Sequence, residues 1–356
     1  MAITYHAGRR LQTTSTDFGT DGAGIPAVSG GWKELARTTL GSASNTITVS
    51  SLADKRYYMV LFDQVSRSGA ANNDVIQFNT DTANNYSRRI SANGGNDSTS
   101  INRLGIELYG NSTNNAFYTG YIANLAEKEK LAQIQLNSGG STGAGNAPAR
   151  VEIVGKWTNT SDAISEIRWK PNNSTETFGA NSEMVVLGFD PADTHTTNFW
   201  EELASVNASG SSTNLSSGTI TAKKYLWIQC YSEGTSGDIL TTFNNDTGAN
   251  YNRRFSIDGG SDSTSVNETS MANMHNAGLG GDDAFSNWFI INNSANEKLV
   301  IGHSVQNGSA GAGTAPPRVE FVHKWANTSS QITEIDFDSQ SGNFGSDSII
   351  KVWGSD

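Results

Sequence analysis

The chain of 356 residues contains one cysteine, Cys230, and only six prolines. A single thiol excludes a disulfide within the chain and any metal site built from cysteine pairs. Cys230 lies in the apolar run Tyr225–Tyr231, where we expect it to be a small buried side chain. The five histidines form neither an HxH nor an HExxH pattern. The sequence therefore predicts no metal site of the zinc type.

Charge and long apolar runs are also scarce. Charged residues make up 17% of the chain, and the net charge is −11. No run of lysine or arginine exceeds two residues, which argues against a nucleic-acid partner. No apolar run approaches the ~18 residues of a membrane-spanning helix, and no secretory signal is visible at the start. We therefore expect no membrane insertion.

Recognisable catalytic patterns are missing as well. The residues Gly139–Gly143 formally match G-x-S-x-G, but they lie in a run of small residues that leads to Pro148, and the second copy has Asn307 instead of glycine at the first position. No pair of acids, no Ser–His–Asp set and no phosphate-binding loop recurs along the chain. The sequence predicts no catalytic residue, no cofactor and no enzymatic activity.

Small polar residues and aromatic residues make up for the scarcity of charged residues and apolar runs. Apolar residues reach only 36%, aromatic residues reach 9%, and there are 37 glycines. Disordered chains are usually rich in charge and poor in aromatic residues, whereas this composition suits short strands joined by many turns. The composition therefore predicts a folded protein rich in strands.

The chain contains the same unit twice. Phe78–Asn102 and Phe243–Asn267 share 16 of 25 residues without a gap, at an offset of 165. Gly143–Ser161 returns as Gly311–Ser329 at an offset of 168. Three blocks in the same order, the first of them beginning at Trp32, indicate a duplicated domain. Each unit is long enough to bury a core of its own.

These blocks predict the domain boundaries. Residues 32–190 form repeat 1, residues 200–356 form repeat 2, and residues 191–199 link them. Residues 1–31 stand outside the duplication. They are rich in glycine and show little periodicity, so we expect an extended N-terminal arm.

The strand pattern is the same in both units. Arg56–Asp63 and Lys224–Tyr231 are continuous apolar runs, which are typical of strands buried on both faces. Residues 151–157 alternate between apolar and polar side chains, as in a half-buried antiparallel strand. Leu125–Ala132 has helical propensity, but the matching residues of repeat 2 favour a strand, so we expect a hairpin there. We predict an all-β fold of two tandem antiparallel β-sandwiches, jelly-roll-like, with about eight strands each.

One polar cluster recurs in both units. The pattern F-N-x-D-x-x-x-N-Y supplies a carboxylate and two amides in each repeat, which are Asn79, Asp81 and Asn85, then Asn244, Asp246 and Asn250. Oxygen ligands of this kind suit calcium, although one acid per site is few. The other interpretation is a turn in which Asn and Asp side chains bond the nearby backbone. The glycine-rich segments Gly94–Ser100 and Gly259–Ser265 predict tight turns that could also contact a ligand.

The order of these motifs resembles β-sandwich proteins of tailed-bacteriophage particles. The matching segments are Phe78–Asp81, Lys156–Thr160 and Ser341–Ser346. The opening Thr4–Arg10 is similar to the start of marine viral structural proteins with this domain. The resemblance covers both units, and its motifs are structural. It implies a non-enzymatic protein of the virion surface, of the capsid decoration or head-fibre type.

The resemblance also implies partners. We expect contact with the major capsid protein or other virion proteins through the arm, with Tyr5, His6, Arg9 and Arg10 as attachment residues. We further expect a homo-oligomer, because surface appendages follow the symmetry of their platform. The alternative is a tail-associated receptor-binding module that recognises host surface glycans.

Overall fold

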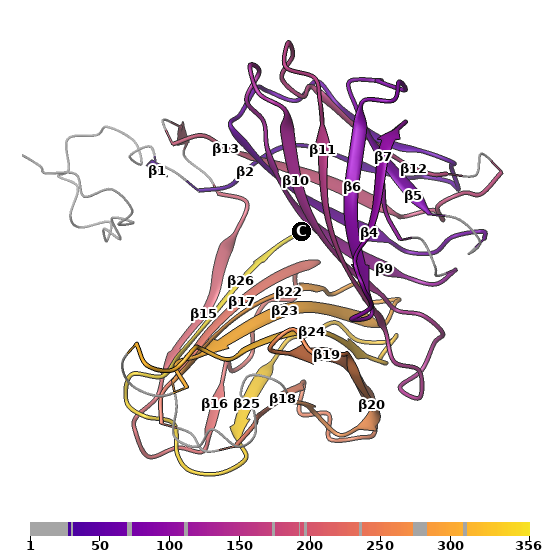
Figure 1. Cartoon of the computed structure of the whole chain (residues 1–356). Helices are drawn as coiled ribbons and strands as arrows, with labels where there is room; N and C mark the ends of the chain where they lie inside the picture. Colours follow the sequence, from indigo (N-terminus) through magenta and orange to yellow (C-terminus); the bar gives the residue numbers. More distant parts are fainter. Residues whose placement is uncertain are drawn as a thin grey trace, which may run out of the picture.

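The computed structural model describes residues 28–29, 31–69, 73–109, 113–172, 175–191, 193–195, 198–234, 237–272, 283–308 and 312–356. Within these residues the chain forms 26 strands and no helix. Figure 1 shows two stacked bodies of strands, one from each repeat. The prediction of an all-β fold with two antiparallel β-sandwiches is confirmed.

Repeat 1 folds into one large and one small antiparallel sheet. The large sheet has the order β2-β13-β4-β9-β10-β11-β6-β7 and the small sheet the order β3-β12-β5-β8. The strands are β2 (Lys33–Thr39), β3 (Ile47–Ser50), β4 (Tyr57–Gln64), β5 (Asp74–Phe78), β6 (Tyr86–Ala92), β7 (Ser98–Arg103), β8 (Ile106–Glu107), β9 (Ala116–Ala123), β10 (Lys130–Ser138), β11 (Ala149–Trp157), β12 (Glu166–Pro171) and β13 (Glu183–Phe189).

Repeat 2 has the same topology. Its large sheet has the order β15-β26-β17-β22-β23-β24-β19-β20 and its small sheet the order β16-β25-β18-β21. The strands are β15 (Glu201–Asn207), β16 (Asn214–Ser216), β17 (Tyr225–Ser232), β18 (Ile239–Phe243), β19 (Tyr251–Ile257), β20 (Ser263–Glu268), β21 (Met271–Ala272), β22 (Ala284–Ile291), β23 (Lys298–Gln306), β24 (Arg318–Trp325), β25 (Ile335–Ser339) and β26 (Ile349–Ser355).

Each sandwich therefore has twelve described strands, where the sequence predicted about eight. The difference comes from strands that carry little apolar signal. The edge strand β7 reads STSINR and is mostly exposed, and β8 has only two residues. Such strands are formed by pairing with a neighbour rather than by burial of their own side chains. Turns, not helices, join them, and Leu125–Ala132 forms the predicted hairpin between β9 and β10.

Each repeat has its own apolar core between its two sheets. In β4, Tyr58, Val60 and Phe62 point into the core of repeat 1. Trp157 and its counterpart Trp325 are fully buried in the two cores, as the alternating pattern predicts. Cys230 is buried in the core of repeat 2. The inward faces are therefore filled by the residues that the period of two places there.

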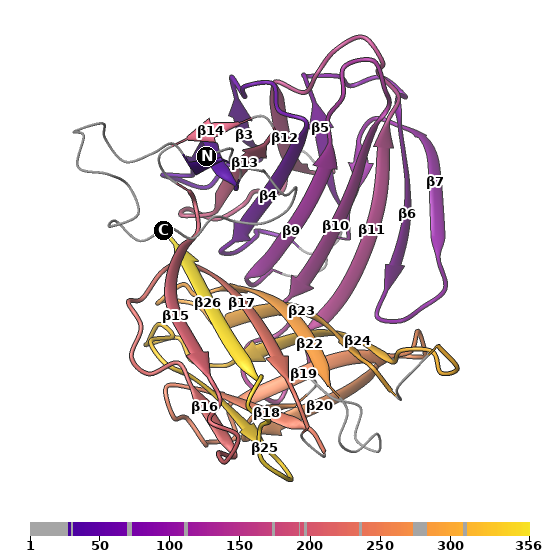
Figure 2. The same cartoon turned by 90° about the vertical axis from the view of Figure 1, so that its left-hand side faces the viewer.

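A third apolar cluster joins the repeats. In β4, Met59 and Leu61 alternate with the core residues and point to the opposite face of the large sheet. There they pack against the large sheet of repeat 2, whose face stands opposite in Figures 1 and 2. The cluster comprises Met59, Leu61, Phe117, Val185, Leu187, Phe199, Trp200, Tyr225, Phe289, Ile291, Leu299, Ile301, Val322 and Trp353. This contact explains the continuous apolar run of β4, because both faces of the strand are buried.

Hydrogen bonds also connect the two repeats beside this cluster. Asn137 Nδ2 donates to the carbonyls of Val300 at 2.9 Å and of His323 at 2.7 Å. Lys324 Nζ donates to the carbonyls of Gly139 at 2.9 Å and Ser141 at 2.7 Å. These donors are buried. Without the hydrogen bonds they would have neither water nor a protein partner, which costs free energy.

The end of the arm meets the linker. The two-residue strand β1 (Val28–Ser29) pairs with β14 (Thr194–His195), a short strand that lies inside the segment expected to be only a linker. Tyr5, His6, Arg9 and Arg10 lie outside the described residues.

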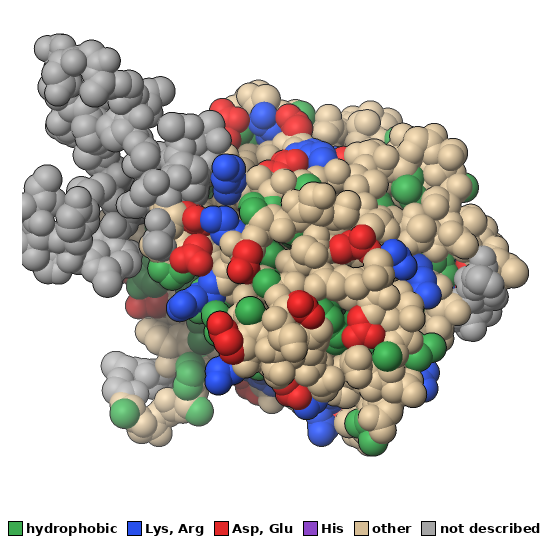
Figure 3. Space-filling view, turned by 90° about the horizontal axis from the view of Figure 1, so that it is seen from above, with side chains coloured by type: hydrophobic (Ala, Val, Ile, Leu, Met, Phe, Trp, Pro, Cys, Tyr) green, Lys and Arg blue, Asp and Glu red, His purple; other side chains and the backbone are tan. Residues whose placement is uncertain are grey.

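On the face drawn in Figure 3, acidic and basic side chains are interspersed among neutral polar groups. Among the described residues no helix could span a membrane.

Candidate functional site

The recurring Asn/Asp cluster forms a turn after β5. Asp81 Oδ1 accepts a hydrogen bond from the backbone N–H of Ala83 at 2.8 Å. Asp81 Oδ2 accepts hydrogen bonds from Asn85 Nδ2 at 2.8 Å and from the indole of Trp157 at 2.7 Å. Asn79 Oδ1 accepts from the backbone N–H of Ser165 at 2.7 Å. The cluster therefore ties the turn to the start of β12 and to the core tryptophan.

Repeat 2 reproduces these bonds. Asp246 Oδ1 accepts from the backbone N–H of Gly248 at 2.9 Å, and Oδ2 accepts from Asn250 Nδ2 at 2.9 Å and from the indole of Trp325 at 2.7 Å. Asn244 Oδ1 accepts from the backbone N–H of Thr333 at 2.8 Å. The structure thus brings together all six residues of the predicted cluster in two equal turns. A calcium ion would have to compete with these hydrogen bonds, and the calcium hypothesis stays a prediction.

The same hydrogen bonds set the charge of the two acids. Partial burial works against ionisation of Asp81, but the bonds from Asn85, Trp157 and Ala83 hold the pKa of its carboxyl below the usual range. The pKa of Asp246 is lowered in the same way, against partial burial, by the bonds from Trp325, Asn250 and Gly248. Donors aimed at an ionised carboxylate stabilise that form. The two carboxylates therefore act as charged acceptors that organise the turns.

The glycine-rich turns meet at the boundary between the repeats. Gly94 has a φ of +68°, a conformation that glycine adopts without strain. A Cβ on Gly94 would lie 2.6 Å from the backbone nitrogen of Asp262. The turn of repeat 1 therefore packs closely on the corresponding turn of repeat 2. The predicted tight turns are present, and Asp97 of the turn in repeat 1 lines a cleft.

This cleft lies between the two large sheets and has a volume of about 490 Å³. Its walls come from both repeats and combine amides, carboxylates and aromatic rings. The lining residues are Arg89, Ser91, Asp97, Thr119, Tyr121, Gln133, Ile134, Gln135, Glu152, Ile153, Val154, Asn287, Phe289, His303 and Glu320. Ligand sites prefer such positions between domains, so we regard the cleft as the candidate functional site.

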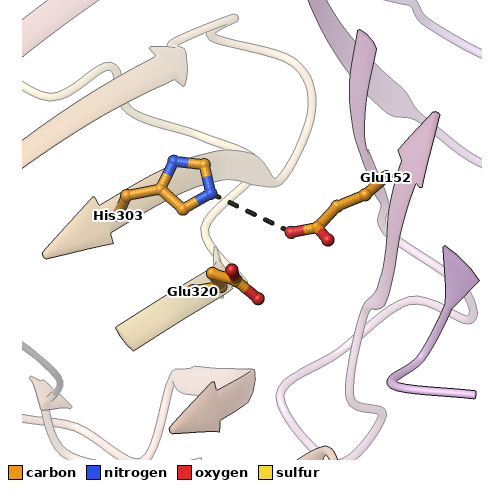
Figure 4. Close-up of side chains that lie close together, drawn as sticks. All are labelled: Glu152, His303 and Glu320. Carbon is orange, nitrogen blue, oxygen red and sulfur yellow. Dashed lines mark ion pairs between the residues drawn. The ribbon is translucent and has the colours of Figure 1, made fainter. Parts of the chain in front are cut away.

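Three ionisable side chains converge on one side of the cleft. Glu152 on β11 faces His303 on β23 and Glu320 on β24, as Figure 4 shows. Ligand atoms from the three residues lie within 4.8 Å of one another, and His303 Nε2 lies 3.9 Å from Glu152 Oε1. One histidine and two carboxylates are a donor set that a divalent ion can use.

Arginines already neutralise these carboxylates. Arg150 Nη1 lies 2.7 Å from Glu152 Oε1 and 3.2 Å from Glu320 Oε2. Arg318 Nη1 lies 2.6 Å from Glu320 Oε1. Burial opposes ionisation of Glu152, but His303 and Arg150 hold its pKa below the usual range. A metal ion here would have to displace Arg150, so the cluster is better described as an ion-pair network across the cleft.

Arg150 also reaches the glycine-rich turn of repeat 2. Its Nη2 lies 2.6 Å from Oδ1 of the buried Asp262. In repeat 1, the equivalent carboxylate is that of Asp97, and Arg89 Nη1 lies 3.1 Å from its Oδ2. In repeat 2, Asp262 pairs with Arg150 instead, so one arginine of repeat 1 ties the two repeats together.

Sequence reasoning did not identify Glu152, His303 and Glu320 as neighbours. Glu152 and Glu320 occupy equivalent positions on the polar face of a predicted strand, and this repetition was the available signal. The contact itself depends on how the large sheets face each other. No periodic pattern encodes that arrangement, because a strand pattern reports only which face is buried.

Comparisons with known proteins do not assign the chain to a family. No protein-family model matches the chain, and no curated protein is significantly similar. Among solved structures, the mouse laminin alpha1 chain, domains LG4-5, is 9% identical with a TM-score of 0.19, covering 94% of this chain and 92% of that chain. Human GIVD cytosolic phospholipase A2 is 7% identical with a TM-score of 0.13, covering 77% of this chain and 33% of that chain.

Proposed function

We propose that this chain is a non-enzymatic structural protein of a virion surface, a capsid decoration or head-fibre protein of a tailed bacteriophage. The observation that carries the proposal is the use of the repeated polar motif. In both repeats Asp81, Asp246 and their amide neighbours hold turns against core tryptophans. Residues duplicated for such bonds favour a rigid scaffold over a reaction centre.

The joined sandwiches support the same proposal. An apolar cluster and buried donors such as Asn137 and Lys324 connect the repeats, which suits a particle surface that must keep its shape. Residues 1–31 would attach the body to the major capsid protein or to another virion protein. Because β1 pairs with β14, the last residues of the arm lie at the boundary between the repeats.

Imaging of intact particles tests this proposal. Antibodies against the purified chain, coupled to gold, are applied to virus particles recovered from the source of the sequence. We expect label on the head surface at many copies per particle. Particles that carry no label, while the antibody detects the purified chain, would overturn the proposal.

Removal of residues 1–27, which leaves β1 in place, tests the attachment. The shortened chain should keep its unfolding midpoint and lose binding to particles that lack the protein. The substitution Lys156→Met on the exposed surface provides a matched control that should bind normally. Unchanged binding of the shortened chain would contradict attachment through the arm.

The cleft favours a second candidate, a tail-associated receptor-binding module for host glycans. It combines the exposed ring of Tyr121 with the amides of Gln133 and Asn287. The same labelling experiment separates the two candidates, because a receptor-binding module would be found at the tail.

A further inference from the structure

We propose that the cleft between the two large sheets binds a neutral oligosaccharide. The inference supplies a ligand for the second candidate function, but it depends only on the cleft and not on where the chain resides. It rests on polar atoms that form no hydrogen bond with the described residues and that lie beside an exposed aromatic ring. Glycan ligands present hydroxyl groups at the edge of each sugar ring and C–H groups on its faces, so they need both kinds of contact.

Thr119 is the most informative polar group of the cleft. Its side chain lines the cleft although the residue is only 2% exposed. Among the described residues none forms a hydrogen bond with its hydroxyl. A hydroxyl that faces the cleft without a partner in the chain is open to a ligand or to water. Thr119 therefore offers a donor and an acceptor to a molecule in the cleft.

Two amides extend this polar surface. Asn287 Oδ1 accepts hydrogen bonds from Trp227 Nε1 at 2.6 Å and Gln229 Nε2 at 3.2 Å. These bonds fix the orientation of the amide and leave Nδ2 as a donor beside the cleft. Gln133 projects from the opposite sheet and is exposed. Amides on two facing sheets can address hydroxyl groups on both edges of a sugar ring.

Tyr121 provides the aromatic surface. It is 41% exposed on β9, and its ring centroid lies 6.0 Å from that of Trp32. Tyr121 and Gln133 also line an adjoining hollow of about 320 Å³ with Trp32, Tyr57 and Phe189. The two spaces therefore form a path from a polar end to an aromatic end. This path suits a chain of several sugar units rather than a single one.

The charges of the cleft select a neutral ligand. Three carboxylates line it, those of Asp97, Glu152 and Glu320, and each is paired with an arginine. An anionic glycan would find no unpaired cation among these groups and would meet the net charge of −11. A cationic ligand would find the carboxylates already paired with arginines. Ionised carboxylates remain strong acceptors for hydroxyl groups.

Binding is tested with the full chain on an array of neutral oligosaccharides of glucose, mannose and galactose and of sialylated and sulfated glycans. The best neutral ligand is then titrated by calorimetry. We expect Tyr121→Ala to weaken binding about tenfold and Thr119→Val to weaken it about fivefold. Phe285→Ala is the matched control, since Phe285 is 42% exposed on β22 outside the cleft, and it should leave affinity unchanged.

Three results would overturn the inference. They are no binding of neutral oligosaccharides at millimolar concentration, binding only of acidic glycans, and binding that Tyr121→Ala and Thr119→Val leave intact. Circular dichroism of each variant separates loss of binding from loss of fold. Absence of the protein from virus particles would remove the proposed function and leave a positive titration valid. If no neutral oligosaccharide binds on the array while the antibody labels the heads of virus particles, the proposed function stands and the inference about the ligand is overturned.

Discussion

Gln135 and His303 occupy the same position in the two repeats, 168 residues apart, and they contact each other, with 2.9 Å between the two Nε2 atoms. Strands β10 and β23 therefore cross at equivalent points. The contacts farther away are not equivalent. Arg150 pairs with Asp262, whereas the counterpart residues Arg318 and Asp97 pair within their own repeats. The duplicated sandwiches thus meet in an approximately symmetric way that opens into a cleft on one side.

The first prediction compares one lysine in its two environments. Lys324 is buried, lies 3.3 Å from Glu297 and donates to two carbonyls of repeat 1. Its counterpart Lys156 forms the equivalent pair with Glu129 at 3.0 Å on the exposed surface. Lys324→Met should lower the free energy of unfolding by about 3–5 kcal/mol, because it leaves a buried carboxylate unpaired. Lys156→Met should change it by less than about 1 kcal/mol.

Chemical unfolding followed by tryptophan fluorescence measures both variants. Glu297→Gln combined with Lys324→Met should recover part of the loss, since the unpaired charge is removed. Equal stability of the two single variants would show that the contact between repeats contributes little.

Much of this fold could be predicted from the sequence. The duplication, the alternation in residues 151–157 and the continuous run Arg56–Asp63 led to two β-sandwiches and to strands buried on both faces. The start of β12 at Glu166 does not follow from the strand pattern alone. The reason is that Asn79 Oδ1 accepts the backbone N–H groups of Ser165 and Glu166, which a neighbouring strand would otherwise bond.

The cleft could not be predicted in the same way. Glu152 and His303 were recognisable only as polar residues on a strand and as an isolated histidine. Their proximity depends on the packing of two outer sheet faces, and that packing is determined by Met59, Leu61 and the opposing aromatic residues together. Local periodicity reports burial but not the identity of the covering surface.

The second prediction concerns a buried ion-pair network within repeat 1. Arg67 pairs with Asp74 at 2.9 Å and also with Glu176, and the side chains are almost fully buried. Arg67→Met should destabilise the chain by about 3–5 kcal/mol, because two carboxylates remain without a cation. The triple variant with Asp74→Asn and Glu176→Gln should be more stable than the single variant. A triple variant as unstable as Arg67→Met would show that packing, not charge, accounts for the loss.

The third prediction separates the turn from the calcium hypothesis. Asp81→Asn and Asp246→Asn each replace an acceptor of Trp157 or Trp325 by an amide that has one oxygen. We expect each to cost about 1–3 kcal/mol, with similar values because the two turns are equal. Millimolar calcium should leave the melting temperature of the original chain unchanged. A calcium-dependent rise that both variants abolish would establish the metal site instead.

The same two acids predict a dependence on acid pH. Their lowered pKa in the folded chain stabilises it above the unfolded value of about 3.9. This stability is lost as the pH falls through the lower folded pKa, because the carboxylates must then take up protons. Unfolding midpoints between about pH 6 and pH 2 should fall less steeply in the double variant Asp81→Asn, Asp246→Asn. Parallel curves would assign the acid loss to other carboxylates.

The last prediction concerns alkaline pH and Lys298. Burial lowers the pKa of this lysine to about 8, and Glu297 acts in the opposite direction. The ammonium group donates to the carbonyls of Asn296 at 3.0 Å and Asn327 at 2.8 Å and lies over the ring of Trp325. Between about pH 8 and the ordinary lysine value of 10.5, the unfolded chain therefore binds more protons than the folded chain.

Stability linked to this group should consequently rise as the pH increases from about 8 to about 10.5. Lys298→Met removes the titrating group, so its unfolding free energy should lack this increment, which is roughly 3 kcal/mol at most. The measurement is the difference between variant and original chain across the pH range, because other groups titrate equally in both. A constant difference would mean that the two carbonyls and the ring hold the lysine charged, and that its pKa is not lowered.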